Sequence, residues 1–276
     1  MKKLITALVA VVAVISLTAC GSSKKESKED HKYVVGVASD SQKEIWEHVG
    51  ESLKKEGITL DVKLFSGYTE ENPALADGSL DLNSFQHVAY LNNYNEENKQ
   101  NLVHIAYTLV SPFGLYSEKI KNYADLKDGD TVAIPNDVTN GGRALQLLEA
   151  IDVIELKKDA PSSPTVKDIK NYNKKIKIQE IQADQLTSVL PDVTAATINT
   201  NFVIDQLHTT PQESAIYIDT DHLSKVSELY KNVIAVRKKD KNKADFKKIV
   251  KAYQTKHTAE MIEKTGDIPA WEDADK

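Results

Sequence analysis

The sharpest candidate for chemistry is the motif Asn140-Gly141-Gly142-Arg143. It follows an apolar run, Thr131–Ile134, and precedes helix-forming residues, Ala144–Glu149. A helix start after two glycines offers unpaired backbone N–H groups, and an arginine in its first turn adds a planar guanidinium that fits an anion. Phosphate loops carry longer glycine patterns that end in Lys-Ser/Thr, so we expect a carboxylate site. The alternative is an ordinary loop with a solvated arginine.

A second group of candidates is aromatic. If Leu82–His87 is extended, Phe85 and His87 point to the same side. Tyr90 lies one turn into the helix expected next, and Tyr68 could complete a pocket wall. Such a wall suits a flexible apolar side chain, particularly a thioether. The alternative is aromatic core packing, with His87 a hydrogen-bonded interior histidine.

Two asparagines form a third candidate. Asn199 and Asn201 are spaced to share one face of a strand, and two amides on an apolar strand need partners. They could accept from an ammonium group or donate to a carboxylate. The alternative is that they cap a turn at the strand end.

Signatures of catalysis are missing from the sequence. There is no Gly-x-Ser-x-Gly motif and no dinucleotide-binding glycine pattern. The seven histidines are scattered, without the paired spacing of metal ligands. We therefore expect a binding protein without catalytic residues, cofactor or metal.

The first 32 residues predict export and lipidation. Lys2 and Lys3 precede an apolar run that ends at Ala19, which is typical of a signal peptide over residues 1–19 and short for a membrane-spanning helix. The alternative is a retained N-terminal anchor helix. Cys20, the only cysteine, stands at the cleavage point of a bacterial lipoprotein and would carry the acyl chains, including palmitate. Residues 20–32 are small and charged, so we expect a flexible tether that holds the protein on the extracytoplasmic face of the cell membrane.

The charge of the chain limits its partners. The formal net charge is −6, and removal of residues 1–19 makes it about −8. A mildly acidic surface argues against nucleic acid and against anionic lipid as partners, so we expect the protein to contact the membrane only through its lipid anchor. With Cys20 lipidated, no thiol remains for a disulfide. We expect a monomer.

Apolar runs and capped helical stretches alternate along the chain, and this alternation predicts an α/β fold with largely parallel sheets. The apolar runs are Tyr33–Ala38, Ile58–Phe65, Leu102–Val110, Thr131–Ile134, Ile176–Ile181, Ala195–Ile198, Ala215–Ile218 and Val233–Val236.

Together these motifs resemble the NlpA/MetQ family, the methionine-binding lipoproteins of bacterial ABC importers. The resemblance runs from about Tyr33 to Trp271. It rests on segments in family order: Asn72–Gly78, Phe85–His87, Gly114–Ser117, Val132–Asp137, Thr139–Leu145, Ile198–Asn201 and Ile268–Trp271.

The resemblance implies a two-lobed fold of the periplasmic-binding-protein type (type II), with the ligand between the lobes. Lobe I would comprise residues 33–112 and 203–276, and lobe II residues 113–202. The chain would cross near Ser111–Gly114 and again near Asn201.

The resemblance also implies roles for individual residues. Tyr68, Phe85, His87 and Tyr90 would surround the ligand side chain. Asn140 and Arg143 would hold its carboxylate, and Asn199 and Asn201 its head group.

The function we expect is capture of L-methionine and its delivery to an ABC permease and its ATPase. Three alternatives remain at this point: a methionine-containing dipeptide, another amino acid, and an adhesin-like surface protein that does not transport.

Overall fold

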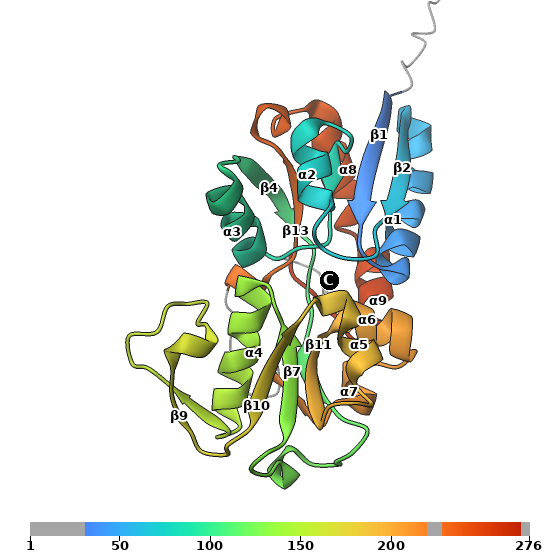
Figure 1. Cartoon of the computed structure of the whole chain (residues 1–276). Helices are drawn as coiled ribbons and strands as arrows, with labels where there is room; N and C mark the ends of the chain where they lie inside the picture. The colour runs from blue at the N-terminus through green and yellow to red at the C-terminus, as the bar shows by residue number, and fades with distance from the viewer. Residues whose placement is uncertain (1–30, 220–227, 272–276) are drawn as a thin grey trace, which may run out of the picture.

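The computed structural model describes residues 31–219 and 228–271. These residues form two lobes, each with a five-stranded sheet between helices (Figure 1). The predicted signal peptide, Cys20 and the tether lie outside the described residues.

The sheet of the first lobe has the strand order β2-β1-β3-β13-β4. Strand β1 is parallel to β2 and β3, whereas β13 is antiparallel to both its neighbours. The elements of this lobe are β1 (His31–Val37), α1 (Asp40–Leu53), β2 (Ile58–Leu64), α2 (Glu71–Asp77), β3 (Leu82–Asn83), α3 (Val88–Asn98), β4 (Leu102–Tyr107), β13 (Val233–Arg237), α8 (Ala244–Tyr253) and α9 (Lys256–Glu263).

Alternation along the strands explains why helices cover both faces of this sheet. Val35 and Val37 pack with α1 and α8, while Val34, on the opposite side of the same strand, packs against the group formed with α2 and α3. Trp46 on α1 is fully buried in the first of these two cores.

The second lobe repeats this layout with the order β10-β7-β11-β6-β12, in which β6 is the reversed strand. Its elements are β6 (Phe113–Tyr116), β7 (Thr131–Pro135), α4 (Val138–Ala150), β8 (Ile154–Leu156), β9 (Ile169–Tyr172), β10 (Lys177–Ile181), α5 (Leu186–Val189), β11 (Ala195–Asn199), α6 (Thr200–Phe202), α7 (Pro211–Ser214) and β12 (Tyr217–Ile218). Strands β8 and β9 pair with each other, apart from the main sheet.

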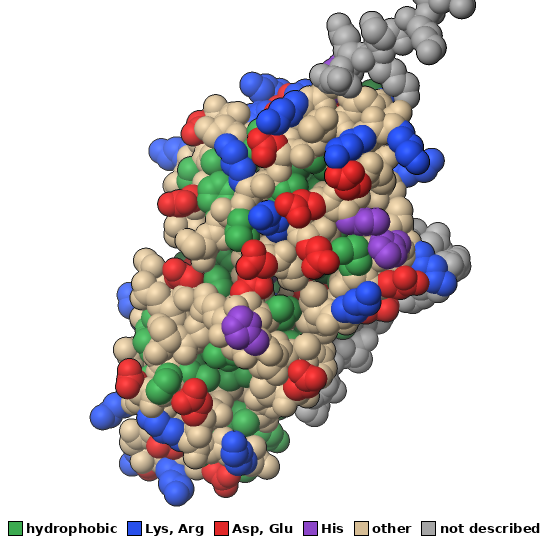
Figure 2. Space-filling view, turned by 90° about the vertical axis from the view of Figure 1, so that its right-hand side faces the viewer, with side chains coloured by type: hydrophobic (Ala, Val, Ile, Leu, Met, Phe, Trp, Pro, Cys, Tyr) green, Lys and Arg blue, Asp and Glu red, His purple; other side chains and the backbone are tan. Residues whose placement is uncertain are grey.

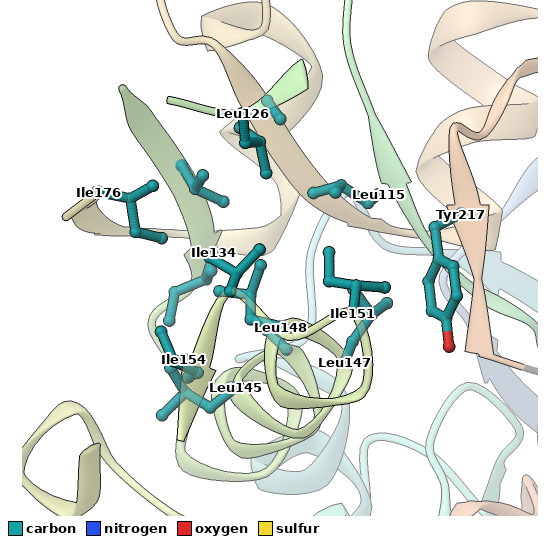
Figure 3. Close-up of a cluster of buried hydrophobic side chains, with 14 of the residues drawn as sticks. Leu115, Leu126, Ile134, Leu145, Leu147, Leu148, Ile151, Ile154, Ile176 and Tyr217 are labelled. Atoms are coloured by element: carbon teal, nitrogen blue, oxygen red, sulfur yellow. The ribbon is translucent and has the colours of Figure 1, made fainter. Parts of the chain in front are cut away.

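Helix α4 is anchored by the main core of this lobe (Figure 3). Leu148 points from α4 towards Ile134 on β7, Leu145 lies beside Ile154, and Leu115 comes from β6 in the same sheet. Burying such side chains favours folding by roughly 1.5–3 kcal/mol each, which fixes α4 on the sheet.

The chain passes from the first lobe to the second between β5 (Leu109–Val110) and β6, and β14 (Ile268–Pro269) pairs with β5 beside this crossing. The return crossing differs from the expected one at residue 203. Phe202 and Val203 are buried in the core of the second lobe, and β12 belongs to its sheet. The second lobe therefore extends to Ile218, because the chain must complete the fifth strand before it returns.

On the face shown in Figure 2, basic and acidic side chains are interspersed and no large area carries one sign. In the described ranges, no helix is long and apolar enough to cross a membrane.

Candidate functional site

A cleft between the lobes contains all eight residues that the sequence singled out. The cavity volume between these residues is about 40 Å³, so the two lobes lie close together around it. The first lobe supplies Tyr68, Phe85, His87 and Tyr90, and the second supplies Asn140, Arg143, Asn199 and Asn201.

The predicted aromatic wall is present in the cleft. The ring of Tyr68 lies 5.8 Å from that of Phe85 and 6.1 Å from that of Tyr90, and Phe202 adds a fourth ring 5.1 Å from Tyr68. The phenol of Tyr90 donates to the backbone oxygen of Tyr68 over 2.9 Å. Burial raises the pKa values of both tyrosines above their ordinary value, so the wall is uncharged.

His87 caps the helix that carries Tyr90. Its Nδ1 accepts from the backbone N–H of Tyr90 over 3.1 Å, so in the neutral ring the proton is on Nε2. Nε2 then donates to Asn140 Oδ1 over 3.4 Å, which joins the two lobes. Burial, aided by the charge of Arg143, lowers the pKa of His87 to about 3. The histidine is therefore a neutral hydrogen-bonding group in the cleft.

The amide of Asn140 is fully used by protein groups. Its Oδ1 accepts from His87 and from Asn199 Nδ2, the latter over 2.9 Å, and its Nδ2 donates to both oxygens of Asp137. The opposite end of the Asn199 amide is different, because its Oδ1 is buried without a hydrogen-bond partner in the described part of the chain. Asn140 thus orients Asn199, which offers a free acceptor.

Arg143 is buried and held from several sides. Its Nε donates to Asp219 Oδ2 over 2.7 Å, and its Nη2 donates to the backbone oxygen of Ser111 over 2.9 Å. The guanidinium also lies over the rings of Phe113 and Tyr230, 5.1 and 4.6 Å from their centroids. Nη1 is the nitrogen that neither Asp219 nor Ser111 uses, so Arg143 is a positioned donor whose charge is balanced by Asp219.

The helix start predicted at the glycine pair is wrong. Helix α4 begins at Val138, and its N-cap is Asp137, whose carboxylate accepts from the backbone N–H of Asn140 over 2.9 Å. This acidic N-cap occupies the Asn140 N–H and places a negative charge at the helix start, which disfavours an anion there. The glycines serve close packing instead. A Cβ on Gly141 would lie 2.7 Å from the Pro135 oxygen, and one on Gly142 would lie 2.8 Å from Ser163 Cα.

The shared strand face predicted for the two asparagines is also wrong. Strand β11 ends at Asn199, and Asn201 lies in α6. The Asn201 amide donates to the Ala38 backbone oxygen over 3.0 Å and accepts from the Tyr68 phenol over 2.5 Å. Both groups belong to the first lobe, so Asn201 fastens the lobes together across the cleft.

Sequence reasoning missed several polar residues of the cleft, among them Ser111, Asn232 and Asp267. With its amide nitrogen towards the backbone oxygens of Phe85 and Gln86, Asn232 donates over 3.2 and 3.3 Å. The available signal was position: Asn232 and Asp267 each stand immediately before a short apolar strand. Among the described residues, no group of three His, Cys, Asp or Glu side chains could hold a metal ion.

Because the pKa of His87 falls from 6.5 to about 3 on folding, the free energy of unfolding should decrease as the pH drops from 6.5 to 4.5. The unfolded chain takes up a proton in this range and the folded chain does not. We expect His87→Asn, which keeps a helix-capping acceptor, to remove roughly 2 kcal/mol of this decrease in urea unfolding at the two pH values. His257→Asn, at an exposed position, is the matched control. Equal pH dependence in wild type and His87→Asn would contradict the assignment.

Known proteins are similar to this chain in both sequence and fold. The profile of the NlpA lipoprotein family matches residues 33–271. "Outer membrane lipoprotein 3" of Mannheimia haemolytica is 40% identical over 252 residues, which cover 90% of this chain and 91% of that protein. "D-methionine-binding lipoprotein MetQ" of Escherichia coli K12 is 35% identical over 276 residues, which cover 98% of both.

A solved structure has the same architecture. It is that of a nutrient-binding protein from Burkholderia cenocepacia bound to methionine, with 39% identity and a TM-score of 0.80 over 87% of this chain and all of that one. The predicted fold class is therefore confirmed as a two-lobed, periplasmic-binding-protein-like fold. The chain belongs to the NlpA lipoprotein family, as its motifs had indicated.

Proposed function

We propose that this chain is the solute-binding lipoprotein of a bacterial ABC importer and that its ligand is L-methionine. The observation that carries the proposal is an interlobe cleft with an aromatic wall at one part and the buried Arg143 guanidinium at another. The names of its relatives support it, since one is called a D-methionine-binding lipoprotein and another is described as bound to methionine.

The side chain and the carboxylate of methionine each have a matching group in the cleft. The thioether fits among Tyr68, Phe85 and Tyr90, because sulfur makes favourable contacts with ring edges. The carboxylate fits Arg143 Nη1, and such charge-assisted hydrogen bonds contribute about 1.5–3 kcal/mol each. The role is binding and release rather than catalysis, since the family is one of substrate-binding proteins and the groups of the cleft are used for recognition.

The N-terminal segment supports a place for the protein at the membrane. Relatives are named lipoproteins, and Cys20 stands where a lipoprotein is acylated. We infer that acylated Cys20 anchors the protein on the extracytoplasmic face of the membrane, where it delivers ligand to a permease and its ATPase.

Calorimetric titration tests the ligand. The unlipidated chain from residue 20 onward, unfolded and refolded to remove carried-over ligand, is titrated with L-methionine, D-methionine and glycyl-L-methionine. We expect the tightest binding with L-methionine, together with ligand-dependent compaction in solution scattering as the lobes close. Binding of the dipeptide alone would change the ligand and keep the role. If a folded sample binds none of the three ligands, methionine capture is rejected.

A further inference from the structure

Asp267 is a buried carboxylate in the cleft that no contact described above employs. It lies immediately before β14, whose residue Ile268 pairs with Val110 on β5. This pairing sets Asp267 beside Ser111, at the crossing between the lobes. The side chain of Asp267 thus enters the cleft from the hinge side, although Asp267 lies more than 120 residues from Arg143 along the chain.

The two oxygens of Asp267 differ in their surroundings. Oδ2 accepts from the Thr265 hydroxyl over 3.0 Å, whereas Oδ1 is buried and has no hydrogen-bond partner in residues 31–219 and 228–271. No salt bridge joins Asp267 to a basic side chain within those ranges, and Arg143 is paired with Asp219 instead. An unpartnered buried acceptor destabilises the structure, more so when it is charged, and a bound donor would remove this cost.

A second unpartnered acceptor faces the same cleft. Asn199 Oδ1 is buried and lacks a donor, as Asp267 Oδ1 does. Ser111 connects Asp267 to the arginine, because its backbone oxygen accepts from Arg143 Nη2 and its side chain lies beside the Asp267 carboxyl. The cleft therefore holds one positioned cation and, separately, two acceptors in need of donors.

We propose that Asp267 Oδ1 receives the protonated primary amine of the ligand while Arg143 binds its carboxylate. This inference rests on the proposed function and adds the residue that recognises the amine. A primary ammonium carries three N–H donors, which match the carboxylate of Asp267 and the amide oxygen of Asn199. The amine is the α-ammonium of a free amino acid or the terminal ammonium of a small peptide.

The electrostatics of Asp267 agree with such a ligand. Burial raises the pKa of the Asp267 carboxyl to about 7, and the hydroxyl groups of Ser111 and Thr265 act in the opposite direction without offsetting it. A neighbouring cation would favour the ionised form of this carboxyl. Binding of an ammonium group would therefore convert an unfavourable buried charge into an ion pair.

The test compares two ligands that differ only in the amine. Wild type and Asp267→Asn are titrated with L-methionine and with 4-(methylsulfanyl)butanoate, which is methionine with hydrogen in place of the amino group. We expect Asp267→Asn to weaken L-methionine binding by roughly 10- to 100-fold and to change the affinity for the butanoate less than about twofold. Asp192→Asn, at an exposed position outside the cleft, removes the same charge and should leave both affinities unchanged.

Each outcome has a distinct meaning. If Asp267→Asn lowers the affinity for both ligands equally, Asp267 is a structural residue and the inference is overturned. Unchanged affinity for L-methionine would also overturn it. If the wild type binds glycyl-L-methionine instead, the same comparison uses N-acetyl-L-methionine, which lacks only that amine. If the wild type binds none of these ligands, the proposed function itself is wrong, and the wild-type titration alone shows this.

Discussion

Arg143→Ala lowers the affinity for L-methionine by about 30-fold to several thousand-fold, a loss of about 2–5 kcal/mol. The reason is that a buried carboxylate would lose its charged donor while Asp219, which pairs with Arg143 over 2.7 Å, would be left without its cation. Calorimetric titration of wild type and variant measures this difference.

Two companion variants separate the causes. Arg143→Lys keeps the charge but loses the planar guanidinium, so we expect an intermediate loss. Asp219→Asn keeps the positive charge and tests whether Asp219 acts by orienting Arg143, since Asp219 also accepts from the Phe113 backbone N–H over 2.9 Å. Unchanged affinity in Arg143→Ala, in a variant that unfolds as cooperatively as the wild type, would refute the carboxylate contact.

Glu71→Gln stabilises the protein at neutral pH. Glu71 begins α2, is fully buried, and neither of its carboxyl oxygens has a hydrogen-bond partner in the described residues. Burial raises its pKa from 4.5 to about 8. The unfolded chain releases this proton first as the pH rises, so the wild type loses stability between about pH 4.5 and 8. We expect the free energy of unfolding of the wild type to fall by up to about 3 kcal/mol by pH 7, and we expect no such fall in Glu71→Gln.

Urea unfolding at pH 5 and pH 7 measures this effect. Glu70→Gln is the matched control, because it makes the same change at the preceding, exposed residue. Asp267 also has a raised pKa, and its contribution cancels when wild type and variant are compared at each pH. A wild type whose stability rises from pH 5 to pH 7 by as much as that of Glu71→Gln would contradict the prediction.

The strands of both lobes were predictable because each is specified by a short pattern of neighbouring residues. Val35 and Val37 alternate with a neighbour on the opposite face, and this period of two follows from the strand alone. The aromatic wall was predictable for a related reason, since Phe85, His87 and Tyr90 are close along the chain and local geometry places them together.

Errors arose where two local signals competed or where the chain turned. At α4, the acidic cap Asp137 outweighs the glycines as a helix start, because its carboxylate accepts a backbone N–H that glycine would leave free. Asn201 was expected on a strand, but β11 ends two residues earlier. The amide of Asn201 instead joins the two lobes. The return of the chain after Ile218, and not near residue 203, depends on the fifth strand of the second sheet.

By itself, the sequence determined the alternation of strands and helices, the family and eight of the residues that line the cleft. These follow from residue types at short spacing. The tertiary structure alone decided which polar groups remain free. Arg143 pairs with Asp219, the Asn140 amide is hydrogen-bonded to protein groups, and Asp267 keeps an unpartnered oxygen. These outcomes depend on burial and pairing between segments that come together from distant parts of the chain.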